Sequence, residues 1–157
     1  MKEKAMNKLS MLALELKCYD NEYLRLTIDE VFGFPNEIAY GGGYGARGSL
    51  DIQVGLYNVH AKHCFTTGEL YDFYCQLQKC YDSISGESIL TNTDQELELK
   101  LSFGKTGKIF VTGEFQARLD ISNRLCFEMT TDQTYISDVL ADLRKVYQKF
   151  GNSSGIT

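Results

Sequence analysis

The glycine-rich segment at residues 41–48 has the residue spacing that most resembles a known chemical motif. Gly43-Tyr44-Gly45-Ala46-Arg47-Gly48 satisfies the G-x-G-x-x-G pattern of dinucleotide-binding loops. That motif needs a helix directly after the loop, because the pyrophosphate binds at the helix N-terminus. Here residues 49–54 follow, and their alternation of polar and apolar side chains is typical of a strand. We therefore expect no nucleotide at this loop and no other cofactor in the chain.

Tyrosine and arginine side chains at turns and loops are the candidate contacts to a partner. Tyr40, Tyr44 and Arg47 belong to the glycine-rich loop, and Tyr19 and Tyr23 flank a turn at Asp20-Asn21. Tyr and Arg are enriched among the residues that dominate binding energy at interfaces. We predict that these five residues bind a partner. The alternative is an ordinary loop in which the glycines supply left-handed backbone conformations.

Metal binding is not expected, although His60, His63 and Cys64 lie close together in the sequence. On an extended strand His60 and His63 point to opposite faces, so they cannot reach one ion together. The other four cysteines show no C-x-x-C spacing, and we expect buried free thiols. These cysteines are Cys18, Cys75, Cys80 and Cys126.

Carboxylates at Glu96 and Glu98, with Asp94 nearby, are the remaining candidates for acid–base chemistry. Catalysis would need one of them in an environment that raises its pKa. The alternating leucines at positions 97, 99 and 101 take the core face of the strand, which leaves the glutamates on the solvent face. No nucleophile elbow, P-loop, H-E-x-x-H or EF-hand pattern is present. We predict that the chain is not an enzyme and has no catalytic residues.

Composition sets the broad class of the protein. The chain has 157 residues, of which 43% are hydrophobic and 24% charged, with a formal net charge of −5. This length predicts one domain, and no apolar run approaches the length needed to cross a bilayer. Residues 1–8 show no signal peptide, so five cysteines suggest free thiols in a reducing cytoplasm. The acidic balance argues against nucleic acid and favours a basic partner.

The first half of the chain reads as strands followed by one helix. Alternation predicts strands near residues 12–18 and 24–28, joined as a hairpin. The apolar residues occupy even-numbered positions before Gly55 and odd-numbered positions after it. We therefore interpret residues 50–65 as one long strand bent by a β-bulge. A helix follows, with a capping box formed by Thr66 and Glu69 and an end at Gly86.

The second half repeats this order. Alternation predicts strands at residues 97–103, 109–119 and 125–129, and the apolar stripe of residues 136–150 predicts a helix that starts near Thr131 or Asp132 and ends at Gly151. We predict an α+β domain over residues 1–151, with order βββα-βββα and two amphipathic helices on one face of an antiparallel sheet. Residues 152–157 read as a flexible C-terminal tail.

This layout resembles the WapI-like family of bacterial immunity proteins over roughly residues 45–150. The resemblance rests on element order, the capped helix at residues 66–74, the strand around Leu97-Glu98-Leu99, the turn at Gly107 and the strand at residues 108–115 that leads on to the last helix. It implies a small cytoplasmic protein that binds and neutralises the toxin domain of a wall-associated or contact-dependent protein.

Two alternatives remain open at this point. The chain can be an enzyme or small-ligand protein with a pocket near the loop at residues 41–48. It can also form a homodimer through an exposed sheet edge.

Overall fold

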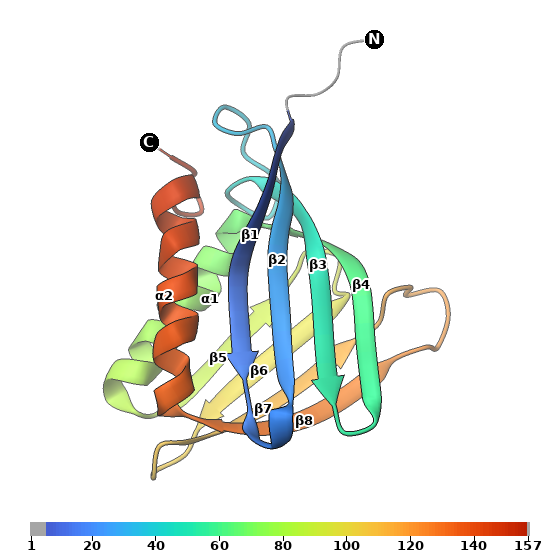
Figure 1. Ribbon diagram of the computed structural model, residues 1–157. Helices are drawn as coiled ribbons and strands as arrows, with labels where there is room; N and C mark the ends of the chain where they lie inside the picture. The colour runs from blue at the N-terminus through green and yellow to red at the C-terminus, as the bar shows by residue number, and fades with distance from the viewer. Residues whose placement is uncertain (1–5, 157) are drawn as a thin grey trace.

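The computed structural model describes residues 6–156, with side chains from residue 10 onward, and arranges them as two four-stranded sheets and two helices (Figure 1). The first sheet consists of β1 (Met6–Lys17), β2 (Tyr23–Phe32), β3 (Gly45–Val54) and β4 (Tyr57–Thr66). The second consists of β5 (Gly86–Thr91), β6 (Leu97–Phe103), β7 (Lys108–Phe115) and β8 (Leu125–Asp132). Both sheets are antiparallel meanders in chain order. Helix α1 (Thr67–Ser83) follows the first and α2 (Gln133–Phe150) the second.

The predicted α+β class is confirmed, but each half has four strands before its helix rather than three. The predicted bulge at Gly55 is wrong, because Gly55 and Leu56 form a two-residue turn between β3 and β4, with Val54 paired to Tyr57. Gly55 has φ of 55°, which suits glycine in such a turn. A two-residue turn places its flanking residues on the same face. It therefore shifts the alternation of apolar residues by one position along the sequence, just as a bulge does.

Strand β5 is absent from the predicted elements because its buried and exposed residues invert the usual pattern. Ser88 is fully buried, while Ile89 is exposed at the surface. The Ser88 hydroxyl donates to Cys80 Sγ at 3.3 Å, so the polar group has a partner inside. A pattern search that seeks apolar residues on the buried face finds only Leu90 in this strand.

The helix starts follow the sequence signals closely. Thr66 accepts a hydrogen bond from the Glu69 amide, and Glu69 accepts one from the Thr66 amide, which confirms the capping box. Asp132 caps α2 by accepting from the Thr134 amide, and Gly151 ends that helix as expected. The end of α1 differs, because Ile84 adopts the left-handed conformation two residues before Gly86.

The helices lie along one side of the two sheets, and each covers the first strand of the opposite half (Figure 1). Helix α2 packs against β1, α1 packs against β5, and the two helices pack against each other. Buried side chains of both sheets and both helices belong to one hydrophobic cluster. The antiparallel structure is thus divided between two sheets that share a core, with the helices closing its side.

The C-terminal segment folds back on the glycine-rich loop. The expected tail, residues 152–157, is described up to residue 156, and the Gly43 amide donates to the Ser153 carbonyl at 2.7 Å. Residues 1–8, in which we expected no signal peptide, lie outside the residues whose side chains are described. Within residues 6–156, neither helix is long and apolar enough to cross a membrane.

Candidate partner-binding surface

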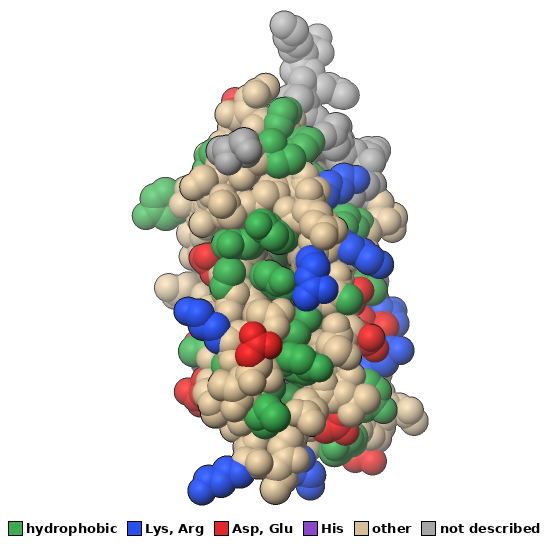
Figure 2. All heavy atoms as spheres, turned by 90° about the vertical axis from the view of Figure 1, so that its left-hand side faces the viewer, with side chains coloured by type: hydrophobic (Ala, Val, Ile, Leu, Met, Phe, Trp, Pro, Cys, Tyr) green, Lys and Arg blue, Asp and Glu red, His purple; other side chains and the backbone are tan. Residues whose placement is uncertain are grey.

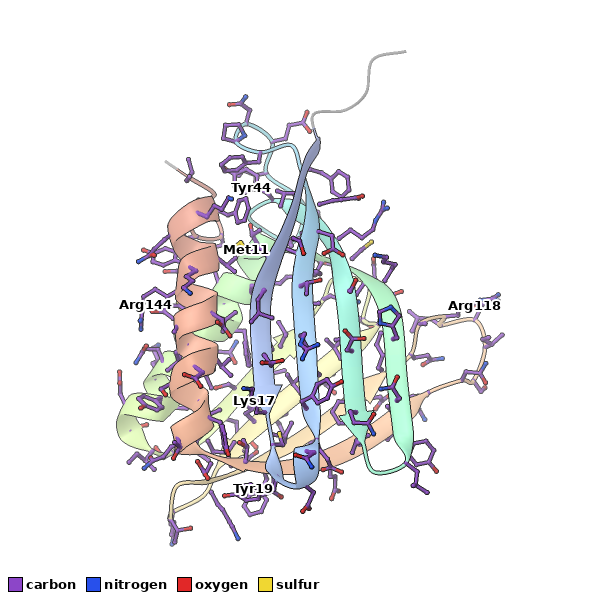
Figure 3. The ribbon with its side chains drawn as sticks, in the orientation of Figure 1. Met11, Lys17, Tyr19, Tyr44, Arg118 and Arg144 are labelled. Carbon is purple, nitrogen blue, oxygen red and sulfur yellow. The ribbon has the colours of Figure 1, made fainter. Side chains whose placement is uncertain are left out.

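The five predicted contact residues do not form one surface. Tyr19 lies at the turn between β1 and β2, whereas Tyr44 lies near the opposite end of the first sheet (Figure 3). Tyr23 begins β2 close to Tyr19, and Tyr40 and Arg47 belong to the end that carries Tyr44. A single partner contact therefore cannot be centred on all five. Whether any of them binds a partner stays a prediction.

Tyr44 makes contacts within the chain. Its side chain is fully buried, and its hydroxyl donates to the Pro35 carbonyl at 2.9 Å. The same hydroxyl accepts a hydrogen bond from the Ile156 amide at 3.0 Å. The ring packs edge-on against Phe34 with centroids 5.0 Å apart. The glycines around Tyr44 let the loop wrap this ring instead of presenting it to solvent.

The other four predicted residues are accessible to differing degrees. The side chain of Tyr40 is 98% exposed, so it has no structural partner to explain its presence. Tyr19 donates from its hydroxyl to Asp132 Oδ2 at 2.9 Å. Arg25 lies over the ring of Tyr23, and Arg47 lies over Phe32 and pairs with Glu30 at 3.4 Å. Three of the four thus take part in contacts within the chain.

The loop preceding β3 does carry a hollow, as the small-ligand alternative requires. It has a volume of about 370 Å³ and is lined by residues 32–34 and 36–39 together with Gly45. Glu37 is the single titratable side chain among these lining residues. Ligand sites and active sites normally bring several polar groups together, and this hollow does not.

A larger concave region lies on the second sheet and has a strongly acidic lining. Two adjoining hollows of about 420 and 270 Å³ share Thr91, Asn92 and Thr93. We call their combined lining the acidic groove. Among the described residues that line it there is no Lys or Arg, whereas five carry carboxylates: Glu69, Asp72, Glu96, Glu98 and Glu114. The groove thus offers a negatively charged surface that runs from helix α1 to strand β7.

Two of these carboxylates belong to residues that face each other across neighbouring strands. Glu98 on β6 pairs directly with Glu114 on β7. Like charges at opposed positions destabilise a sheet. Arg124 bonds to Glu114 Oε1 at 3.0 Å, but Glu98 has no ion pair among the described residues. The like charge of Glu98 opposite Glu114 therefore destabilises this part of the sheet in the free protein.

The outer face of the first sheet shows the opposite arrangement. Glu15 pairs with Arg25 at 2.6 Å, Asp29 with Lys62 at 3.5 Å, and Glu30 with Arg47 at 3.4 Å. These cross-strand pairs neutralise the acidic side chains locally. The acidic groove differs from this face in that no Lys or Arg belongs to its lining among the described residues.

A buried histidine lies behind Glu96 and is not itself part of the lining of the acidic groove. His63 on β4 is only 2% exposed, and its Nδ1 lies 3.6 Å from Glu96 Oε1 without a hydrogen-bond partner among the described residues. Burial lowers the pKa of His63 to about 4, so the ring is neutral at pH 7 and leaves the charge of Glu96 uncompensated. Burial, together with the negative charge of Asp94, raises the pKa of Glu96.

The sequence reasoning on these histidines is confirmed in part. His60 is exposed and His63 buried, so they point to opposite faces as expected. Within residues 6–156 no group of three or more His, Cys, Asp and Glu residues could hold a metal ion. All five cysteines are free, but only Cys18 and Cys80 are buried, whereas Cys64 and Cys126 are exposed. The expectation of burial covered Cys18, Cys75, Cys80 and Cys126, and it is wrong for Cys126, whereas Cys75 is half-buried.

The helix side of the molecule carries a cluster of tyrosines that the sequence did not single out. Tyr71 and Tyr147 have ring centroids 5.0 Å apart, and Tyr74 lies next to both. The Arg144 guanidinium donates to the Tyr74 hydroxyl at 3.3 Å. Figure 2 shows this side, with hydrophobic side chains gathered along its middle and charged ones around them. The helical spacing of Tyr74 and Tyr147 indicates a core stripe, so only the structure reveals their partial exposure.

The sequence did identify Glu96 and Glu98, but it placed both on one strand and assigned them to a solubilising face. In the structure Glu96 precedes β6, and the Asn92 side chain accepts a hydrogen bond from its amide at 3.0 Å. This turn draws Glu96 inward against His63. Glu69, Asp72 and Glu114 join the groove through tertiary packing, which no local pattern records.

The comparisons with known proteins agree with this architecture. The Immunity protein WapI-like family matches the chain over residues 15–151, from β1 to the end of α2. The chain belongs to this family. A comparison with curated proteins finds no match. Membership in the WapI-like family confirms the resemblance that the sequence suggested, over a longer stretch than the resemblance itself covered.

Proposed function

We propose that the chain is an immunity protein that binds and neutralises a bacterial toxin domain without catalysing a reaction. The observation that carries this proposal is the family match, which extends over residues 15–151 and so includes both sheets and both helices. The function would then belong to the folded domain as a whole, and its surface must supply the contact.

The acidic groove is the contact surface that the charges favour. The chain has a net charge of −5, and five of its carboxylates belong to the lining of one concave region that has no Lys or Arg among its described lining residues. Such a region attracts a basic partner and accelerates its association. We propose that the toxin presents a basic segment to this groove and that nucleic acid is repelled from it.

A binding role without catalysis also agrees with the geometry of the groove. His63 lies next to the groove and is the kind of side chain best suited to move protons near neutral pH, but it is buried behind Glu96 and its lowered pKa of about 4 keeps it neutral. The exposed thiols of Cys64 and Cys126 fit a reducing compartment. We therefore place the protein in the cytoplasm.

Co-expression tests the proposal. The chain is produced with and without the toxin domain encoded beside it, and growth is recorded together with formation of a complex on a sizing column. We expect growth to be rescued and the two proteins to elute together. Absence of both results would overturn the proposal.

Variants locate the contact. Replacing both Glu98 and Glu114 by Gln removes charge from the acidic groove, whereas Glu87→Gln removes charge from a residue of the same sheet outside the groove. We expect the double variant to weaken rescue and the Glu87 variant to leave it unchanged. If instead Arg144→Ala abolishes rescue and the double variant does not, the tyrosine cluster on the helices is the contact surface.

Self-association is a separate possibility that the same column resolves. β4 is an edge strand of the first sheet, but its Cys64 carbonyl already accepts a hydrogen bond from Asn92 Nδ2 at 3.1 Å. Charged residues along an edge, such as Lys62, also oppose strand pairing between chains. We therefore expect the free chain to elute as a monomer, and a dimer that grows with concentration would overturn this expectation.

A further inference from the structure

We propose that a hollow beside the turn between β1 and β2 is a binding site for one aromatic side chain supplied by the partner protein. The proposal rests on the proposed function for the identity of the partner, but the chemistry of the site can be tested without it. Three observations support the proposal: the tyrosines in the lining of the hollow, the cancellation of its charges, and an arginine that is held in a fixed orientation and remains partly exposed.

The hollow lies where three parts of the fold meet. Its lining comes from the end of β1, the start of β2 with the turn between them, and Tyr135 in the first turn of α2. The Tyr19 hydroxyl ties this turn to the start of α2 by donating to Asp132 Oδ2 at 2.9 Å. Figure 3 shows Lys17 and Tyr19 at this end of the first sheet. The volume of about 340 Å³ is ample for one aromatic side chain.

The charges in the lining cancel within the chain. Two carboxylates, Glu15 and Glu22, belong to it together with two cations, Lys17 and Arg25. Glu15 accepts a hydrogen bond from Arg25 at 2.7 Å and lies 3.8 Å from Lys17 Nζ, and Glu22 accepts one from the Gly55 amide at 2.8 Å. A charged group entering here finds no net opposite charge, whereas an uncharged aromatic ring leaves these pairs intact.

Arg25 is the side chain that favours an aromatic group over an aliphatic one. Its Nε and Nη2 lie 2.7 and 2.6 Å from Glu15 Oε2, which fixes the orientation of the guanidinium. One side of the guanidinium lies over the Tyr23 ring, 5.2 Å from the centroid. The side chain is nevertheless 41% exposed and lines the hollow, so a ring from the partner can stack on the side away from Tyr23. Ring faces attract cations, and a planar guanidinium stacks on them.

Tyr23 and Tyr135 supply aromatic surface on either side of the hollow. Both belong to its lining, and the side chain of Tyr135 is 38% exposed. Aromatic rings pack against one another offset or edge to face, and tyrosine and arginine are the residues that most often dominate binding energy at interfaces. The predicted contacts at Tyr19 and Tyr23 thereby acquire distinct roles: Tyr23 lines the site, and Tyr19 holds the turn against α2.

Titration with N-acetyltyrosine amide tests the site in the absence of any toxin. Backbone amide signals of the full chain are followed by NMR as this uncharged compound, or in a parallel sample N-acetylleucine amide, is added to about 20 mM, a range suited to millimolar affinity. We expect saturable changes confined to residues 15–25 and 133–137, with the leucine compound binding more weakly. Arg25→Lys keeps a positive charge beside Glu15 but removes the planar group. It should weaken binding of the tyrosine compound by roughly two- to fivefold, the size of one exposed cation–π contact.

Arg47→Lys is the matched control. Arg47 also lies over an aromatic ring, 5.6 Å from the centroid of Phe32, and pairs with Glu30 at 3.4 Å near the other end of the same sheet. The substitution therefore makes the same chemical change outside the hollow, and affinity for the tyrosine compound should not change. In calorimetric titrations with the toxin domain, we expect Arg25→Lys to weaken the complex and Arg47→Lys to leave it unchanged.

Each result decides a definite point. No saturable change, equal binding of the two compounds, or unchanged affinity in the Arg25 variant would overturn the aromatic site. If that happens while the toxin still rescues growth, the proposed function stands and only this inference fails. Binding of the tyrosine compound without any binding of the toxin supports the site and removes the proposed function instead. A dimer of the free chain that Arg25→Lys abolishes would overturn the assignment to a partner, because a second copy would then fill the hollow.

Discussion

Glu98 on β6 and Glu114 on β7 lie directly opposite each other on the solvent face of the second sheet. The first sheet pairs its acidic side chains with Arg25, Lys62 and Arg47, so the chain has the means to avoid such an arrangement. A repulsive pair that persists in a concave, acidic region suggests that binding and stability compete at these positions. That competition can be measured directly.

Glu98→Gln should make the isolated protein more stable. The substitution removes repulsion between opposed like charges, and we expect the free energy of unfolding to rise by about 0.2–1 kcal/mol. Urea denaturation at low ionic strength measures the change, and added salt should reduce it. Glu87→Gln, which loses contacts to Lys100 and Ser102, is the matched control and should give no gain. A loss of stability in the Glu98 variant would contradict the interpretation.

Tyr44→Phe should destabilise the fold without affecting neutralisation. The variant leaves the Pro35 carbonyl and the Ile156 amide without their shared partner, and unsatisfied groups of this kind cost about 1–3 kcal/mol. Chemical denaturation measures the loss, with Tyr40→Phe as a control that should cost nothing, since Tyr40 is almost fully exposed. Equal stability of both variants would show that the Tyr44 hydroxyl does not hold the C-terminal segment.

Gly48→Ala should disrupt the first sheet. A Cβ at this position would overlap the Thr27 carbonyl on β2, so the two strands would have to separate locally. We expect a loss of more than about 3 kcal/mol, or insoluble protein. Gly55→Ala is the control, because its Cβ would meet open space and only the left-handed backbone would be strained, at about 1–2 kcal/mol. Similar soluble yields and melting temperatures for both variants would contradict this account.

His63 should make the protein lose stability as the pH falls from 6.5 towards 4. Burial lowers the pKa of the folded histidine from 6.5 to about 4, so the unfolded chain binds the proton more readily in this window. The loss is at most about 3 kcal/mol. Glu96 faces His63, and its raised pKa opposes part of this loss, because the folded state holds a carboxyl proton more tightly. The negative charge of Asp94 also opposes the lowering of the His63 pKa, and the rings of Phe65 and Phe115 lie beside the imidazole.

Urea denaturation across this pH range measures the effect. His63→Gln should flatten the pH dependence between pH 6.5 and 4, whatever its stability at pH 7. His60→Gln, which changes an exposed histidine, should retain the dependence of the parent chain. A parent-like slope in the His63 variant would show that another group causes the loss.

The sequence predicted the elements whose patterns are local. The capping box at Thr66 and Glu69 and the cap at Asp132 fixed both helix starts, because hydrogen bonds to backbone amides depend on residues within one turn. The turn at Gly55 was predicted wrongly because a bulge and a two-residue hairpin turn both shift the alternation of apolar residues by one position. Strand β5 was missed because buried Ser88 and exposed Ile89 invert the expected pattern.

The sequence predicted less of the candidate site than of the fold. Glu96 and Glu98 were noticed, but the groove also needs Glu114 and the α1 carboxylates Glu69 and Asp72, which tertiary packing brings to it. Tyr44 was placed at the surface because it lies in a loop, and loops are usually exposed. Its burial depends on contacts with Pro35 and with Ile156, which is 112 residues away in the chain.

Each half of the chain depends on the helix of the other half. α1 covers β5 and α2 covers β1, so each half shields the outer strand of the other. A half-length chain of four strands and one helix would expose both its first strand and the apolar face of its helix. Two identical copies would complete each other by the same exchange. The two halves are therefore interdependent, because each needs the helix of the other to cover its first strand.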